Sequence, residues 1–161
     1  MKNSKINAKK VIIIIVIIVL VLFGLYNITW YQITHEKYDN FSEEMEKTFG
    51  ETYVKPFYTS YSSFEKGYGY KVKYPDYLSY TGNLAITNNK DTTLIIWPGI
   101  FSEDDNEYGV IIQNNEKGYQ IMIDKKANSI EEIYEDESKV LKEKKEEIKD
   151  LLNKANEKWN L

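Results

Sequence analysis

Two residue types that are common in catalytic and metal sites, cysteine and histidine, are nearly missing from this chain. The sequence has no cysteine and a single histidine, His35. The missing cysteines exclude disulfides, thiol catalysis and cysteine metal sites, and a lone histidine argues against a histidine-based metal centre. His35 has no serine or cysteine nucleophile close by in sequence, so it is interpreted as a polar residue on a helix. The sequence also has no glycine-rich phosphate loop and no G-x-S-x-G motif.

Carboxylates are the remaining catalytic candidates. Asp76 with Glu65 is the pair that would suit a glycosidase, in which two carboxyl groups flank the bond that is hydrolysed. Because the chain has 25 acidic residues, such a pair is easily found by chance. The acidic segment 103–107 would attract calcium, but it lacks the Asp-x-Asp-x-Asp-Gly spacing of a calcium loop. The sequence therefore predicts no metal, no cofactor and no enzymatic activity.

Aromatic residues are dense between residues 53 and 80. Rings with a polar tip suit the stacking of sugars and contacts with peptides. The alternation from Tyr68 to Tyr74, however, predicts a strand with one buried face, which would use its tyrosines in the core. The candidate binding residues are therefore the tyrosines of the less regular segments: Tyr58, Tyr61, Tyr77 and Tyr80.

The domain that carries these residues follows the stretch from Val11 to Tyr31, which contains no charged residue and no proline. As a helix it would be roughly 31 Å long, close to the thickness of the hydrocarbon core of a bilayer. It predicts a transmembrane signal-anchor helix over residues 11–31. A cleavable signal peptide is the alternative, but residues 23–27 supply no Ala-x-Ala cleavage site.

The flanks of this stretch predict its direction in the membrane. Only lysines carry charge before it: Lys2, Lys5, Lys9 and Lys10. Positive flanks stay in the cytoplasm, so residues 1–10 form a cytoplasmic tail and residues 32–161 lie outside. Trp30 and Tyr31 then fall at the outer membrane interface, where an aromatic ring keeps its polar atom in water.

Composition narrows the class of partner. All 21 basic residues are lysine, and the four in the N-terminal tail leave 17 against 25 acidic residues beyond the membrane stretch. An acidic domain without arginine is a poor match for nucleic acid, because bidentate recognition of phosphate and guanine relies on the guanidinium group. Richness in lysine, asparagine, isoleucine and tyrosine, with no arginine, indicates an AT-rich coding genome, and we expect a bacterial one.

The periodicity predicts an α+β fold beyond the anchor. Residues 32–50 are predicted as a juxtamembrane helix, which either continues the anchor as a stalk or begins afresh at the capping box Asn40-Phe-Ser-Glu43. Residues 51–161 form the extracytoplasmic domain. An antiparallel meander of about five strands is predicted, at 68–74, 84–87, 92–97, 108–113 and 119–124. A long C-terminal helix, started by the capping box Ser129-Ile-Glu-Glu132, packs against it.

Together these features predict a single-pass membrane protein of a bacterial cell envelope, with a non-enzymatic domain that binds a partner. The expected partners are the lipid bilayer and either an envelope protein or a cell-wall glycan, contacted through the tyrosine-rich surface. A small cell-wall hydrolase built on a carboxylate pair is the alternative. A homodimer formed through the apolar stripes of the helices is a further possibility. The sequence indicates neither the ligand nor the biological process.

Overall fold

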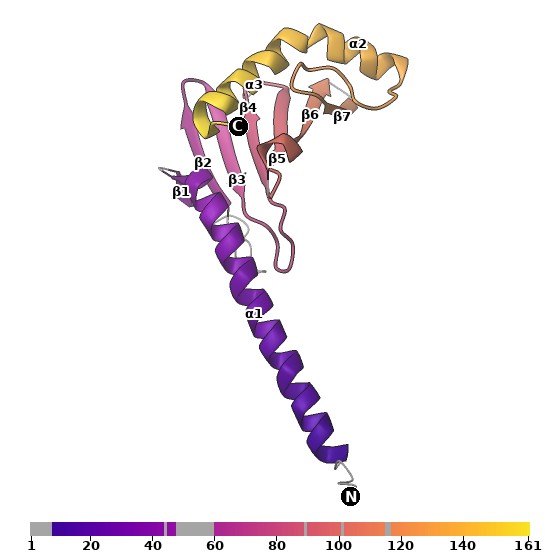
Figure 1. The fold of residues 1–161 in the computed structure, drawn as a ribbon. Coiled ribbons are helices and arrows are strands. Elements are labelled where there is room, and N and C mark those ends of the chain that lie inside the picture. The colour runs from indigo at the N-terminus through magenta and orange to yellow at the C-terminus, as the bar shows by residue number, and fades with distance from the viewer. Residues whose placement is uncertain (1–7, 44, 48–59, 89, 101, 115–116) are drawn as a thin grey trace, which may run out of the picture.

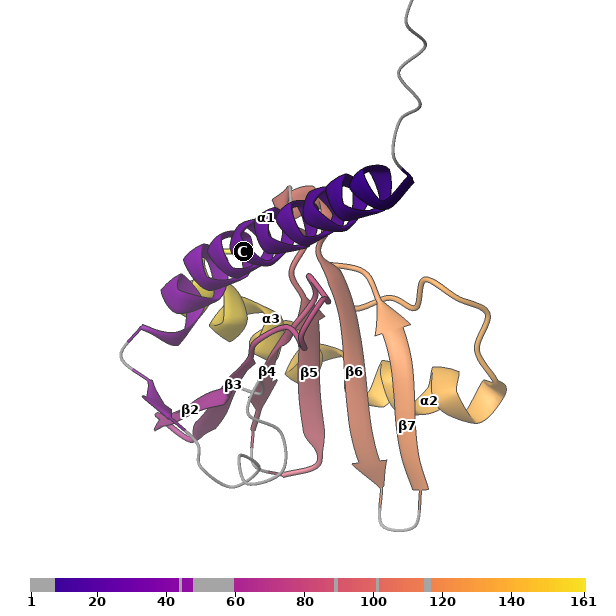
Figure 2. The same ribbon diagram turned by 90° about the horizontal axis from the view of Figure 1, so that it is seen from below.

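The computed structural model describes residues 8–43, 45–47, 60–88, 90–100, 102–114 and 117–161. Within this part of the chain, one long helix projects from a domain built of one sheet and two shorter C-terminal helices (Figures 1 and 2). The α+β fold class is therefore confirmed. Three residues named above, Lys2, Lys5 and Tyr58, lie outside the described residues.

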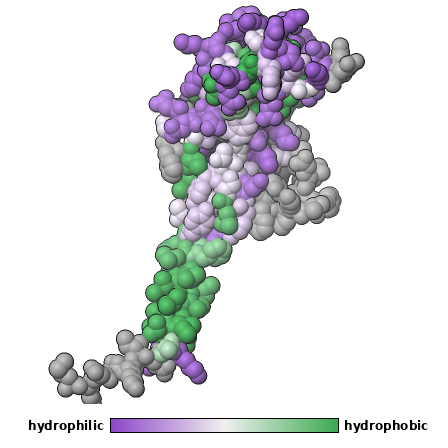
Figure 3. Space-filling view, turned by 90° about the vertical axis from the view of Figure 1, so that its right-hand side faces the viewer, coloured by the Kyte–Doolittle hydropathy of each residue, from purple (hydrophilic) through white to green (hydrophobic). Residues whose placement is uncertain are grey.

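The N-terminal helix α1, Ala8–Ser42, is one unbroken helix of 35 residues. Its apolar part forms a hydrophobic column below a largely hydrophilic domain (Figure 3), and each residue from Ile12 to Leu22 is at least half exposed. Further along, Thr34, Tyr38 and Ser42 are buried in the domain. The stalk interpretation therefore holds up to Ser42, where the helix ends before the predicted residue 50.

The sheet is an antiparallel meander in which each strand pairs with the next in sequence. Among the described residues it has six strands of five or more residues and a two-residue edge strand. The strands are β1 Glu46–Lys47, β2 Ser60–Glu65, β3 Tyr68–Lys73, β4 Asn83–Thr87, β5 Thr92–Trp97, β6 Glu107–Asn114 and β7 Lys117–Ile123. The predicted count of about five is one short of these six longer strands, because β2 lies in a segment that was expected to be irregular.

Strand β2 forms through its pairing rather than through its own composition. Three of its six residues are serine, and serine has no strong preference for strands. It pairs with β3 along its whole length. The two residues between the strands, Lys66 and Gly67, both have positive φ, as in the type I′ turn whose twist matches that of a hairpin.

The core lies between one face of the sheet and helix α3, Lys145–Trp159 (Figure 2). Alternate residues of β3 to β7 point to this face: Tyr70, Val72, Leu84, Ile86, Leu94, Ile96, Tyr108, Val110, Ile112, Ile121 and Ile123. Helix α3 contributes Ile148, Leu151, Ala155 and Trp159, which follow the predicted stripe. The predicted burial of Tyr70 and Tyr74 is confirmed.

The C-terminal helical segment is interrupted, whereas one helix was expected. It comprises α2, Glu135–Glu143, and α3, with Lys144 between them at φ −94° and ψ 2°. The predicted cap at Ser129 is wrong, because its hydroxyl hydrogen-bonds within a turn to the backbone of Glu131 instead. The helix begins later, where the Glu137 carboxylate accepts the backbone N–H of Tyr134 at 2.8 Å.

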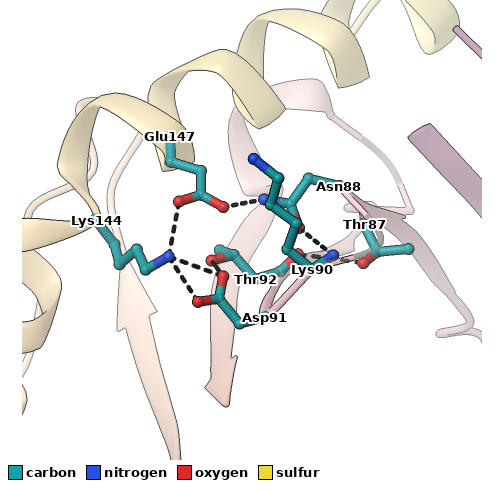
Figure 4. Close-up of polar contacts among 7 residues, drawn as sticks. All are labelled: Thr87, Asn88, Lys90, Asp91, Thr92, Lys144 and Glu147. Carbon is teal, nitrogen blue, oxygen red and sulfur yellow. Dashed lines mark hydrogen bonds and ion pairs between the residues drawn. The ribbon is translucent and has the colours of Figure 1, made fainter. Parts of the chain in front are cut away.

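A polar cluster holds this interruption against the β4–β5 turn (Figure 4). The Lys144 ammonium donates to both carboxylate oxygens of Asp91, at 2.8 and 2.7 Å, and to Glu147 at 2.9 Å. The amide of Asn88 donates to the other oxygen of Glu147. The side chains of Lys144 and Glu147 are under one-third exposed, so their charges are only partly screened.

We expect Asp91→Asn to lower the free energy of unfolding by about 1 kcal/mol at neutral pH, a value already reduced for solvent screening. The hydrogen bond from Lys144 lowers the pKa of the Asp91 carboxyl below its ordinary value. The pair therefore stabilises the fold above the pKa of an unfolded aspartate, about 3.9, and this contribution is lost as the pH falls through the lower folded value. Thermal unfolding at pH 7 and at pH 3 measures the loss of stability and its dependence on pH. Glu146→Gln is the control, because that side chain is 85% exposed in a pair within α3; an equal effect of both substitutions would contradict the expectation.

Candidate functional site

The β3–β4 loop lies against α1 at the outer end of the apolar stretch. The Tyr77 hydroxyl donates to Asn27 Oδ1 at 2.5 Å. The Trp30 indole N–H donates to the carbonyl oxygen of Ser79, and the Tyr26 hydroxyl donates to that of Leu78 at 3.4 Å. These bonds join positions 49 to 52 residues apart in sequence. The loop therefore lies beside α1 and is hydrogen-bonded to about one turn of this helix.

Ring contacts reinforce this attachment. Trp30 and Tyr77 pack edge-to-face with centroids 5.5 Å apart, and Tyr26 and Tyr80 do so at 6.1 Å. Two of the four tyrosines predicted as binding residues, Tyr77 and Tyr80, thus contact the helix of their own chain. The spacing of residues in the sequence contains no signal for this contact.

Tyr61, the third predicted binding residue with a described position, lies on the core side of β2. It is opposite Val72, and its ring is 5.6 Å from that of Tyr74. The structure therefore does not bring Tyr61 together with Tyr77 and Tyr80 into one exposed patch. Tyr61 packs beside the core residue Tyr74, whereas Tyr77 and Tyr80 pack on α1.

Above this contact, a polar network joins α1 to the end of β3. The Tyr74 hydroxyl donates to Asp39 Oδ1 at 2.5 Å and lies 2.9 Å from Ser42 Oγ. Burial, followed by the hydrogen bond to Asp39, raises the pKa of Tyr74. The phenol therefore stays protonated and cannot act as a base for Ser42, which is itself buried. The network stabilises the junction rather than activating a nucleophile.

His35 belongs to the same region. Its ring stacks on that of Tyr31 at 4.0 Å, and its Nδ1 atom lies 3.5 Å from Asp39 Oδ1. Deeper in the junction, Tyr38 is 1% exposed and its hydroxyl accepts the backbone N–H of Gly82 at 2.8 Å. Burial raises the pKa of Tyr38 to about 12. These contacts place the aromatic residues of α1 in a packing role.

The two carboxylates of the glycosidase interpretation lie beyond opposite ends of β3. Glu65 pairs with Lys158 of α3 at 2.6 Å, and this hydrogen bond lowers the pKa of Glu65. Asp76 follows the other end of the strand, 3.7 Å from Lys73. A six-residue strand spans ~20 Å, whereas paired glycosidase carboxyl groups are roughly 5–9.5 Å apart. The structure does not bring this pair together.

The acidic segment 103–107 contains a short 3-10 helix, Glu103–Asp105, followed by the start of β6. Its Asn106 accepts the backbone N–H of Gly99 at 2.9 Å, which closes the loop. Among the described residues, no group of three or more histidine, cysteine, aspartate or glutamate side chains is placed to hold a metal ion.

The second face of the sheet carries an apolar strip that sequence reasoning missed. Its members are partly exposed and lie next to one another across four strands: Ala85, Ile95, Trp97, Ile111 and Met122. Trp97 lies over Gly109, since a Cβ atom there would be 2.9 Å from the indole ring. No helix among the described residues covers this face (Figure 2). We call these five residues the open-face strip. In the sequence, the strip is indicated only by β5, which has apolar residues on both of its faces.

The fold and these surfaces define a class: an α+β domain carried on one helix that is long and apolar enough to cross a membrane. That description fits a single-pass anchor, and by length and composition a signal sequence meets it too. Comparison of the chain with protein-family models, curated proteins and solved structures finds no match.

Proposed function

We propose that this protein is a single-pass membrane protein of a bacterial cell envelope, whose domain lies outside the cytoplasm and binds a partner protein without catalysing a reaction. The observation that carries the proposal is the continuity of α1. One helix runs from the exposed apolar stretch into the core, where Thr34, Tyr38 and Ser42 are buried. Such a helix joins the domain directly to the membrane, which raises the effective concentration of the domain for partners at that surface.

The contacts of α1 support an anchor that is retained. Cleavage near residues 23–27 would remove or free Tyr26 and Asn27, both of which hydrogen-bond to the β3–β4 loop. The remaining Trp30 would then be close to a new chain end, where helices fray. The orientation follows from the lysines before the apolar stretch, Lys9 and Lys10 among them, and from Trp30 and Tyr31 after it.

The open-face strip is the surface best suited to a partner. Tryptophan is enriched among the residues that give most of the binding energy of protein interfaces, methionine is enriched in interfaces generally, and the buried centre of an interface is more apolar than the rest of the surface. A glycan platform would instead need exposed aromatic rings among polar groups, and Tyr77 and Tyr80 are engaged with α1. We therefore favour an envelope protein over a cell-wall glycan as the partner.

The placement of the carboxylates supports a role in binding rather than hydrolysis. A glycosidase acid needs a raised pKa, whereas the pKa of Glu65 is lowered by Lys158. The hydrolase alternative is tested by Glu65→Gln and Asp76→Asn, which would abolish activity on wall material if this pair were catalytic.

A homodimer would have to use surfaces other than the predicted helical stripes. Most apolar residues of α3, and Tyr38 of α1, are buried within the chain. Pairing between copies would then use the exposed apolar stretch 11–31 or the open-face strip. The mass of the protein in detergent, measured by light scattering, distinguishes a monomer from a dimer.

We expect Ile111→Lys to reduce partner capture at least tenfold, which corresponds to about 1.4 kcal/mol. Ile111 is on the open-face strip, and a lysine there keeps an aliphatic stem on the sheet while placing a charge in the interface. Full-length protein is crosslinked in living cells, purified in detergent, and its bound proteins are quantified by mass spectrometry.

Tyr134→Lys is the control for this experiment. It introduces the same lysine at a residue that is 79% exposed and caps the start of α2, outside the sheet. One envelope protein captured by the wild type and by Tyr134→Lys, but lost in Ile111→Lys, supports the proposal. Equal capture by both variants, or capture of wall glycan alone, contradicts it. Thermal unfolding verifies that both variants are folded.

A further inference from the structure

The β3–β4 loop extends from the sheet along α1 toward its apolar end (Figure 1). Its hydrogen bonds to Tyr26, Asn27 and Trp30 place residues 77–79 beside the last part of the apolar stretch 11–31. At a rise of ~1.5 Å per residue, Tyr26 is roughly 7 Å closer to the membrane centre than Tyr31. If residues 11–31 span the membrane, the tip of the loop therefore lies at the level of the outer lipid interface.

The tip of the loop has the composition of an interfacial segment. Residues 77–83 carry no charge. Tyr77 and Leu78 are 39% and 45% exposed, although both are large apolar residues. Leu78 has φ +66°, a left-handed conformation that costs a non-glycine residue on the order of 1 kcal/mol. The fold thus holds a leucine exposed on a strained backbone, which is a common sign of a functional segment.

The backbone polar groups at the tip are also prepared for a water-poor environment. The carbonyl oxygens of Leu78 and Ser79 accept hydrogen bonds from Tyr26 and Trp30, and the Ser79 N–H donates to the Asp76 carbonyl oxygen at 2.8 Å. Lipid tolerates irregular backbone only where such groups are paired within the protein. A loop that remained in water would gain little from these bonds.

We propose that the tip of the β3–β4 loop, residues 77–80, inserts into the outer interfacial layer of the bilayer beside α1 and forms a second membrane contact. The proposal rests on the membrane anchor of the proposed function. Tyr77 and Tyr80 then join Tyr26, Trp30 and Tyr31 in one aromatic belt. Two contacts with the membrane fix the rotation of the domain about α1, so the open-face strip meets partners in one defined orientation.

The absence of cysteine from the sequence allows a direct test with single labels. Full-length Leu78→Cys, Leu20→Cys and Phe64→Cys variants carry one nitroxide label each and are reconstituted into phosphatidylcholine vesicles. Leu20 is 63% exposed on the apolar part of α1, and Phe64 is 65% exposed beside the β2–β3 turn, at the opposite end of β3 from the loop. Collision of each label with oxygen, which concentrates in lipid, and with a nickel chelate, which stays in water, is measured with the chelate on both sides.

The expected result is a severalfold lower collision rate with nickel at Leu78 than at Phe64, with Leu20 lower still. A Leu78 label as accessible to nickel as Phe64, with Leu20 protected, would overturn the insertion of the loop and leave the anchor intact. A Leu20 label exposed to nickel would overturn the anchor itself. If Leu78→Cys does not fold, as judged by thermal unfolding, Tyr77→Cys places the label one residue away and is read in the same way.

Discussion

Gly82→Ala is expected to lower the free energy of unfolding by about 3 kcal/mol, because the new methyl group has no space. A Cβ atom at this position would lie 2.1 Å from the Lys73 carbonyl oxygen, 2.9 Å from the Pro75 nitrogen and 2.8 Å from Tyr38 Cε1. Two of these atoms belong to the backbone, so no side-chain rotation relieves the clash. The loop would have to move away from β3 at the point where β4 begins.

The displacement would also break a buried hydrogen bond. The Gly82 N–H donates to the hydroxyl of Tyr38, which is 1% exposed, and an unpaired donor there costs roughly 1–3 kcal/mol. Because α1 enters the domain at Tyr38, the substitution is expected to loosen the domain from its anchor.

Thermal unfolding of the full-length protein in detergent measures this effect. A loss of about 3 kcal/mol corresponds to a fall in Tm of roughly 6–12 °C for a chain of this size. Gly118→Ala is the matched control, because its Cβ atom would meet only the flexible side chain of Gln113, at 3.3 Å or more. Equal Tm values for the two variants would show that the contact between the loop and Tyr38 is looser than described.

Trp159→Ala is expected to cost about 3–5 kcal/mol, the usual range for removing a buried tryptophan. Trp159 is 6% exposed and lies where α3, α1 and β3 meet. Its indole N–H donates to the carbonyl oxygen of Phe41 at 3.1 Å, and its ring packs edge-to-face on Tyr70 with centroids 5.7 Å apart. The substitution removes both contacts and leaves a cavity between the C-terminal end of α3 and the C-terminal end of α1.

Trp159→Phe separates the two contributions. It keeps an aromatic ring against Tyr70 but removes the hydrogen bond to Phe41, so a loss of about 1–2 kcal/mol is expected. Thermal unfolding of both variants gives the order, and limited proteolysis shows whether the end of α3 is released in Trp159→Ala. Equal losses for the two variants would mean that the packing of the ring contributes little to this junction.

Part of the fold could be predicted because its causes are local. Each strand that alternates between apolar and polar residues, such as β3, shows its buried face in a period of two. The apolar stripe of α3 shows a helical period in the same way. Strand β2 could not be predicted, because Ser60–Glu65 becomes a strand through pairing with β3. The cap at Ser129 failed because the capping-box pattern also fits a turn, which is the structure that forms there.

The candidate surfaces were harder to predict than the fold. Tyr58, Tyr61, Tyr77 and Tyr80 were grouped because they are close in sequence and irregular in spacing. In the structure, Tyr61 packs beside the core residue Tyr74, while Tyr77 and Tyr80 pack on α1. The open-face strip collects residues from four strands, and each of them contributes only one or two positions.

The sequence by itself determined the length and apolar character of the N-terminal helix, the flanking lysines and aromatic residues, and the order of most strands and helices. These properties depend on neighbouring residues, so they can be read along the chain. Only the tertiary structure decided where α1 enters the domain, that the β3–β4 loop lies beside residues 26–30, and which apolar residues no helix of the described part of the chain covers. These features depend on contacts between residues that are distant in sequence, such as the loop and α1, whose hydrogen-bonded positions are 49 to 52 residues apart. The energies of such contacts come from packing and hydrogen bonds that no local pattern records.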